Sequence, residues 1–128
     1  MAALRKEVER LLVQARRDLA NAEKILSTEA YEVVAFLCQQ SVEKGLKALY
    51  THKRRSRAPS THSLIELAAD LSAPKSLGNA FATINPDYVT SRYPDAANGV
   101  PGQLYTKDMA KQRIEAAREV WAWLDRQI

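Results

Sequence analysis

The chain has 128 residues, of which 46% are hydrophobic and 27% are charged, with a formal net charge of +4 and a single cysteine. This length predicts one domain, 1–128, which can bury roughly two-thirds of the surface of its unfolded chain. No apolar run reaches the roughly 18 residues of a membrane-spanning helix, and the charged N-terminal stretch is unlike a signal peptide. One cysteine cannot form an intrachain disulfide, so we expect a cytoplasmic protein without membrane partners.

Two long helices are expected first. Apolar residues at helical spacing predict one helix over 3–26 and a second over 29–53. Ser27 and Thr28 interrupt this pattern and are expected to cap the second helix. The short turn between them makes the two helices antiparallel neighbours. Cys38 falls on the core side of the second helix, where it acts as a small buried hydrophobe.

Shorter elements follow. Ser63, with Glu66 three residues later, predicts a capped helix over 63–71. A fourth helix is expected over 74–84, and a turn can resume after Pro86, at 87–89. The stretch 91–104 is rich in proline and glycine and is expected to be a long irregular loop, which in a compact domain is often functional.

Thr106 is expected to cap a last helix over 107–127. Trp121 lies on its core side, and Trp123 is a candidate contact for a dimer or partner. The predicted fold class is therefore all-α: an up-and-down bundle of about five helices, three of them long, with a short pair between.

The second helix carries an unusual set of side chains opposite its core side. They are an aromatic ring, an amide, two ammonium groups and a carboxylate: Phe36, Gln40, Lys44, Lys47 and, at the edge, Glu43. Such a mixture indicates either a ligand or a partner surface. The alternative is a structural polar network that holds the loop after Arg92, with Glu43 paired to Arg92.

Positive charge is concentrated where this helix ends. Six lysines or arginines and no acid lie between Lys44 and Ile65. Four of them form what we call the basic patch, Lys53, Arg54, Arg55 and Arg57. A patch of this kind attracts phosphate, RNA or an acidic partner surface, and the alternative is a solvated loop.

Three residues are candidates for ligand binding or catalysis: His62, Arg92 and Tyr93. His62 is expected either to bond a carbonyl or a carboxylate such as Glu43, in a structural role, or to act as a catalytic base. Arg92 is expected to grip a phosphate while Tyr93 stacks on a base, or to tie its loop to the bundle. No side chains have convincing metal-ligand spacing and no glycine loop cradles phosphate, so neither metal nor cofactor is expected.

Three parts of the sequence resemble the HEPN domain family (higher eukaryotes and prokaryotes nucleotide-binding). They are Ala15, Asp18, Leu19 and Ala22 in the first helix, the run from Phe36 to Leu49 followed by Thr61-His62-Ser63-Leu64, and Ser91-Arg92-Tyr93-Pro94-Asp95. Their order and separations fit over nearly the whole chain. The resemblance implies a bundle of four or five helices, commonly a homodimer. Prokaryotic members are often encoded beside a minimal nucleotidyltransferase, in toxin–antitoxin or stress-linked pairs.

Many members of that family are metal-independent ribonucleases with an arginine followed, a few residues later, by a histidine at the dimer cleft. Here Ala97, Asn98 and Gly99 stand where that histidine would be. Arg57 and His62 have the spacing but precede the third helix, and we treat that match as coincidental. The sequence therefore leaves enzymatic activity uncertain and leans against it.

The leading expectation is a homodimeric module that binds a nucleotide or RNA phosphate, or docks a minimal nucleotidyltransferase. The residues expected to line its cleft are Gln40, Lys44, Lys47, Arg92 and Tyr93. One alternative is an endoribonuclease toxin that uses Arg92 or Arg57 with His62. The other is a bundle that only docks a partner protein.

Overall fold

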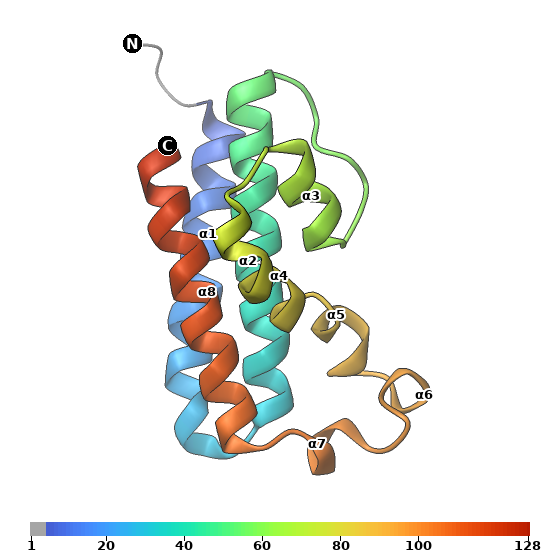
Figure 1. The fold of residues 1–128 in the computed structure, drawn as a ribbon. Coiled ribbons are helices and arrows are strands. Elements are labelled where there is room, and N and C mark those ends of the chain that lie inside the picture. Colours follow the sequence, from blue (N-terminus) through green and yellow to red (C-terminus); the bar gives the residue numbers. More distant parts are fainter. Residues whose placement is uncertain (1–4) are drawn as a thin grey trace.

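The computed structural model describes residues 5–128, and within that range the chain forms helices and turns but no strand. Three long helices run side by side: α1 (Lys6–Ile25), α2 (Tyr31–Arg54) and α8 (Lys107–Gln127) (Figure 1). α2 packs against both of the others. The predicted all-α bundle is confirmed, and the predicted start of the first helix at residue 3 lies outside the described residues.

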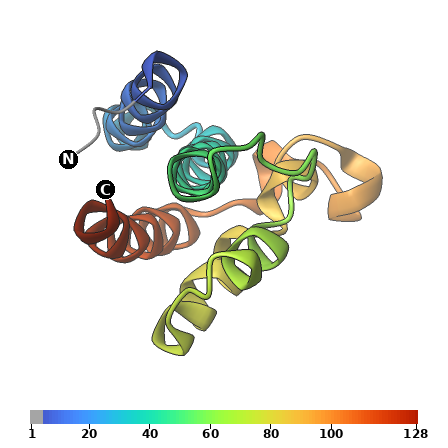
Figure 2. The ribbon, with the colours of Figure 1, turned by 90° about the horizontal axis from the view of Figure 1, so that it is seen from above.

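A second group of elements covers the remaining side of α2. α3 (Leu64–Asp70) packs on α2, and α4 (Gly78–Ile84) packs on α8 and α2, with the 3₁₀ turn η2 (Lys75–Leu77) against α4. Three single-turn helices follow: α5 (Asp87–Thr90), α6 (Pro94–Ala97) and α7 (Pro101–Leu104). Seen from above, they lie on the side of α2 away from α1 (Figure 2). We call the stretch 87–104 the α5–α7 segment.

A chain of two hydrogen bonds joins the three long helices within their apolar core. The indole nitrogen of Trp121 donates to the hydroxyl of Ser41 at 2.9 Å, and that hydroxyl donates to the carbonyl of Ala15 at 2.7 Å. The chain of bonds ties α8, α2 and α1 together and satisfies polar atoms that water cannot reach. Cys38 is fully buried nearby in the same core.

Two of the three helix caps predicted from the sequence are present, and the third is not. The hydroxyl of Ser63 accepts from the Glu66 backbone nitrogen and that of Thr106 from Met109, so both predicted caps are confirmed. The predicted cap at Ser27 and Thr28 is wrong. Their hydroxyls donate backward to carbonyls of α1, within the 3₁₀ turn η1 (Leu26–Thr28), and α2 begins after Ala30 without a side-chain cap.

Two further expectations are corrected. The stretch 91–104 is not irregular throughout, because Pro94 and Pro101 each start a helical turn, where the fixed φ of proline suits the first helical position. Trp123 is 6% exposed and belongs to the core, so it is not available as a partner contact. The packing of α4 on α8 gives the last helix a second buried side. No helix within 5–128 combines the length and apolarity needed to cross a membrane.

Candidate functional site

An exposed arginine is surrounded by aromatic rings where the α5–α7 segment meets α2. The guanidinium carbon of Arg92 lies 4.7 Å from the ring centroid of Phe36, 4.5 Å from that of Tyr88 and 5.1 Å from that of Tyr93. Its Nε donates to the carbonyl of Tyr88 at 2.7 Å. Cation–π attraction to the rings and this bond fix the plane of the guanidinium. We call these residues, with His62, the Arg92 cluster.

His62 joins the cluster from the loop before α3. Its ring stacks on that of Tyr88, with 3.7 Å between the centroids, and its Nδ1 lies 3.0 Å from Oε1 of Glu43. The predicted contact between His62 and Glu43 is therefore confirmed. When Nδ1 carries the proton and donates to Glu43, Nε2 is left to accept one. The His62 side chain is half-exposed, so a ligand can reach it.

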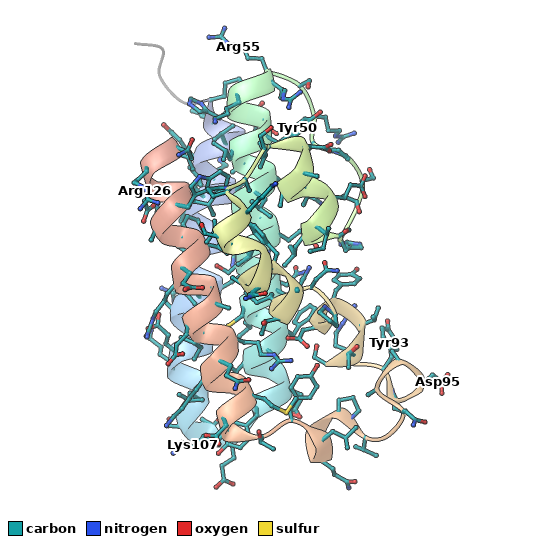
Figure 3. All side chains as sticks on the ribbon, in the orientation of Figure 1. Tyr50, Arg55, Tyr93, Asp95, Lys107 and Arg126 are labelled. Carbon is teal, nitrogen blue, oxygen red and sulfur yellow. The ribbon has the colours of Figure 1, made fainter. Side chains whose placement is uncertain are left out.

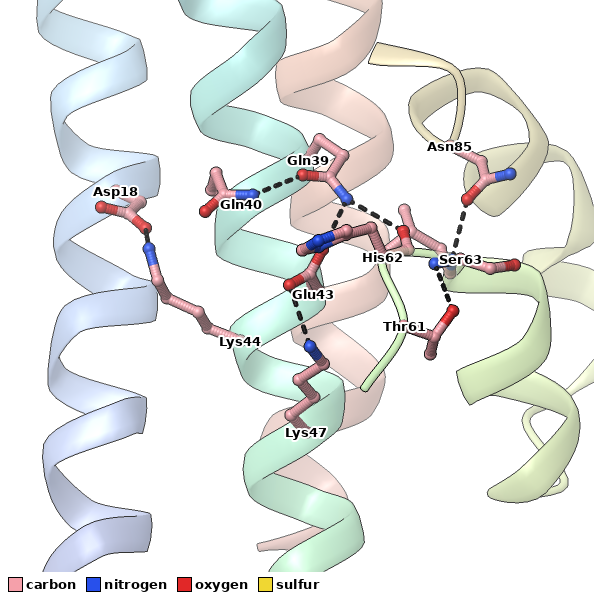
Figure 4. A network of polar contacts seen from close by, with 11 residues as sticks. Asp18, Gln39, Gln40, Glu43, Lys44, Lys47, Thr61, His62, Ser63 and Asn85 are labelled. Carbon is pink, nitrogen blue, oxygen red and sulfur yellow. Dashed lines mark hydrogen bonds and ion pairs between the residues drawn. The ribbon is translucent and has the colours of Figure 1, made fainter. Parts of the chain in front are cut away.

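Glu43 is the centre of a buried polar network that fixes this loop to α2 (Figure 4). Besides His62, its carboxylate accepts from Gln39 Nε2 at 3.0 Å and from Lys47 Nζ at 3.2 Å. Gln39 also donates to the carbonyl of His62 and accepts from Gln40. The expected pairing of Glu43 with Arg92 is wrong, since Glu43 binds these partners while Arg92 lies among the rings.

Lys44 forms an ion pair with Asp18, outside the Glu43 network. Its Nζ lies 2.5 Å from Oδ2 of Asp18, and Figure 4 shows the side chain directed toward α1. Gln14 donates to the other oxygen of Asp18. Among the residues predicted to line a cleft, the structure brings Arg92 and Tyr93 together and places Gln40 and Lys47 in the adjoining Glu43 network. Lys44 instead ties α2 to α1.

Asp87 anchors the segment that carries Arg92. Its carboxylate is 1% exposed and accepts from the Tyr105 hydroxyl at 2.5 Å and from Nε of Arg113 at 2.9 Å. Its carbonyl accepts from the Ser91 hydroxyl. Burial raises the pKa of the Asp87 carboxyl, and the bonds from Tyr105 and Arg113 oppose that rise. The start of α5 is thereby bound to α8, which positions Tyr88 and Arg92.

Sequence reasoning missed three of these residues: Gln39, Asp87 and Tyr88, whose ring contacts both Arg92 and His62. Gln39 is fully buried at the edge of the apolar side of α2, one turn before Glu43, and an amide at this position next to the apolar stripe was the available signal. Asp87 gave no signal of periodicity or spacing, because its partner Arg113 lies 26 residues further along the chain.

The basic patch lies at the C-terminal end of α2, away from the Arg92 cluster. All four of its residues are exposed, and Figure 3 shows Arg55 at the opposite end of the bundle from Lys107. Arg54 donates to the carbonyl of Asp70 and lies over the ring of Tyr50, at 5.4 Å. Lys53 donates to Gln127. His62 contacts Glu43 and Tyr88 rather than Arg57, so the spacing of Arg57 and His62 does not produce a pair.

The Arg92 cluster has the chemistry to hold a phosphate group. A guanidinium presents donors in a fork that matches phosphate oxygens, and the ring of Tyr93 is 54% exposed and able to stack on a flat ligand. The His62 imidazole, stacked on the adjoining Tyr88 ring, adds a ring nitrogen that can form a hydrogen bond to a ligand. Across residues 5–128, no three His, Cys, Asp or Glu side chains are grouped so as to hold a metal ion.

Comparison with known proteins agrees with the resemblance seen in the sequence. The crystal structure of TT1696 from Thermus thermophilus is 29% identical, with a TM-score of 0.86 over 97% of this chain and 100% of that one. The structure of ST0689, an archaeal HEPN homologue, is 31% identical, with a TM-score of 0.80 over 94% and 96% of the two chains. No protein of curated function matches significantly. The family model described as the HEPN domain matches residues 8–127, and the chain therefore belongs to the HEPN domain family.

Proposed function

We propose that this HEPN domain binds a nucleotide or an RNA phosphate at the Arg92 cluster. The observation that carries the proposal is an exposed guanidinium held over three aromatic rings. Since its Nε already donates to the carbonyl of Tyr88, the group is oriented before any ligand arrives. Preorganisation of this kind lowers the entropy lost on binding. The neighbouring Tyr93 ring supplies a surface on which a base stacks.

We further propose that the module forms a homodimer through the α5–α7 segment. Four of the segment's large side chains are exposed by 42%, 54%, 50% and 45%: Val89, Tyr93, Val100 and Leu104. A second copy covering them would remove apolar surface from water and bring two Arg92 clusters to one cleft. A minimal nucleotidyltransferase is the other candidate for this surface.

Light scattering separates these two partners. The mass of a dimer for the chain alone, lowered to that of a monomer by Val100→Asp, supports the homodimer. A chain that stays monomeric alone and forms a complex only with a co-expressed nucleotidyltransferase supports that pairing instead. A chain that is monomeric under both conditions contradicts both assemblies.

The binding proposal is tested by calorimetry with uridine monophosphate. We expect Arg92→Gln to weaken binding on the order of ten- to a hundredfold, because a charge-assisted bond contributes about 1.5–3 kcal/mol. Arg126→Gln removes an exposed arginine from the last turn of α8 and serves as the control. Absence of binding by the wild-type chain, or equal affinity of the Arg92 variant, would contradict the proposal.

An endoribonuclease is the second candidate function, and one observation favours it. His62 and Arg92 both contact the ring of Tyr88, although they are distant in sequence. With Glu43 holding Nδ1, Nε2 of His62 would take the proton of a ribose 2′-hydroxyl as its oxygen bonds to the phosphorus. The bond from phosphorus to the 5′-oxygen of the next nucleotide then breaks, and that oxygen takes a proton from water. Arg92 would stabilise the negative charge that develops on the phosphate. This function needs His62→Gln and Arg92→Gln each to abolish RNA cleavage, and cleavage that persists in both variants excludes it.

A further inference from the structure

We propose that the basic end of α2 is a second binding site for the same single-stranded nucleic acid that engages the Arg92 cluster. The site consists of Tyr50, Arg54, Arg55 and Arg57, which we call the distal site. This inference rests on the proposed function, because it extends a strand held at Arg92. It predicts a ligand of several nucleotides rather than one.

One stretch of chain joins the two sites. α2 ends at Arg54, and the next residue, Arg55, has a φ of 52° that turns the backbone out of the helix. The chain then returns until His62 meets Glu43, 3.0 Å away (Figure 1). Glu43 and Arg54 are separated by eleven residues of helix, which corresponds to about 17 Å. A mononucleotide is too short to reach from one site to the other.

The face of α2 between the sites is polar and partly exposed. Gln40, Lys47 and Thr51 recur at helical spacing on the side that leads to Arg54, and each is only partly buried. Lys47 keeps its ammonium group at the surface end of the Glu43 network, with a side chain 21% exposed. A flexible strand crossing this face would meet amide, ammonium and hydroxyl groups, all of which donate hydrogen bonds to phosphate oxygens.

The distal site repeats the combination found at Arg92. Arg54 lies over the half-buried ring of Tyr50, and Arg55 and Arg57, which follow Arg54 in the chain, are exposed. In the sequence, no acidic residue occurs between Lys44 and Ile65, so this stretch of chain carries only positive side-chain charge. Single-stranded nucleic acids are bound by cations along the backbone together with aromatic rings for the bases. An acidic protein surface would use the arginines but not an aromatic ring at each end, so the pattern favours nucleic acid.

Fluorescence anisotropy with oligouridylates tests the distal site. The probes are a dinucleotide and an oligomer of about ten nucleotides, within the range of single-strand sites. The wild-type chain should bind the longer probe at least about tenfold more tightly, since it gains phosphate contacts. The double variant Arg55→Gln/Arg57→Gln should lose most of this gain and keep its affinity for the dinucleotide. Its salt dependence should become shallower by about 1.4 in log–log slope, for two lost phosphate contacts.

The matched control variant also removes two positive charges, but at the opposite end of the bundle. Lys107→Gln/Lys111→Gln neutralises two exposed lysines near the start of α8 and should leave both affinities unchanged. Equal wild-type affinity for the two probes would overturn the distal site while leaving binding at Arg92 intact. Failure to bind either probe would overturn both proposals. Competition by polyglutamate as strong as by the oligouridylate would overturn the distal site in favour of an acidic protein partner.

Discussion

The rings of His62 and Tyr88 are stacked, with 3.7 Å between their centroids and 13° between their planes. This contact joins the loop before α3 to α5. Since Arg92 lies 4.5 Å from the same Tyr88 ring, the stack brings an arginine and a histidine to one surface although the chain separates them. The missing histidine shortly after Arg92 in the sequence therefore does not decide what the folded site contains.

Tyr88 should matter to binding through its ring rather than its hydroxyl. We expect Tyr88→Ala to weaken nucleotide binding by roughly 1–2 kcal/mol, because Arg92 and His62 lose the aromatic surface that orients them. Tyr88→Phe retains that surface and should bind almost as tightly as wild type. Calorimetry on both variants checks this, and equal losses for Phe and Ala would show that the hydroxyl matters instead.

Two glycines in helices should respond to alanine in opposite directions. A Cβ at Gly45 would lie 2.8 Å from a methyl group of Leu124 and 3.0 Å from the indole of Trp121. We expect Gly45→Ala to lower the free energy of unfolding by about 1–2 kcal/mol, because overpacking exceeds the gain in helix propensity. Gly78 has no atom within 4 Å of the added carbon, so Gly78→Ala should raise stability by about 0.4–1 kcal/mol. Urea denaturation distinguishes these outcomes, and the same sign for both variants would refute the packing argument.

Removing the Asp87 carboxylate should destabilise the fold and loosen the Arg92 cluster. Asp87→Asn leaves the charge of Arg113, a side chain only 14% exposed, without its ionic partner, at a cost of roughly 2–4 kcal/mol near neutral pH. Urea denaturation measures that loss. The NMR resonances of the His62 ring should also shift, since they report the neighbouring Tyr88 ring. Unchanged His62 resonances would show that Asp87 does not position the cluster.

Comparison with Asp87→Asn should also reveal how the free energy of unfolding of the wild type depends on pH. Burial raises the pKa of Asp87 above 3.8, so the native state holds this proton more tightly than the unfolded chain does. The stabilisation that comes from this raised pKa is fully present below pH 3.8. It is lost as the pH rises through the pKa that Asp87 has in the native state. The advantage of wild type over Asp87→Asn in unfolding free energy should therefore grow as the pH falls from neutral through that pKa. A difference that is constant with pH would contradict this linkage.

The thiol of Cys38 should be inert in the native protein. Burial raises its pKa to about 12, and its side chain has no exposed surface. At pH 8 only about one thiol in ten thousand would be ionised, and a thiol reagent in solution cannot reach the buried sulfur. We expect Ellman's reagent to react only after unfolding, at a rate that rises with denaturant concentration. Rapid stoichiometric reaction without denaturant would show that the helices around Cys38 separate readily.

The features that could be predicted from the sequence are those decided by neighbours along the chain. The long helices and the caps at Ser63 and Thr106 depend on residues a few positions apart, and they were predicted correctly. The direction of the Ser27 and Thr28 hydroxyls was not, because each can bond backward as readily as forward. The pairing of His62 with Glu43 is an exception, since the two residues lie 19 positions apart, and it was predicted from their hydrogen-bonding groups alone.

The remaining errors concern how separate elements pack. Trp123 looked available because a helical wheel shows one core side, and the packing of α4 on the other side of α8 has no signature within α8 itself. The partner assigned to Glu43 was wrong because the position of Arg92 depends on where the α5–α7 segment attaches. That attachment is made by Asp87 to Tyr105 and Arg113, across the fold.

The order of Asp87 and Arg113 along the chain has a consequence during synthesis. The ribosome makes Tyr88 and Arg92 well before Arg113, whose guanidinium binds Asp87 from α8. A nascent chain that has not yet exposed this part of α8 lacks the bond that anchors the α5–α7 segment. We therefore expect the chain to acquire its capacity for nucleotide binding only after Arg113 has emerged from the ribosome.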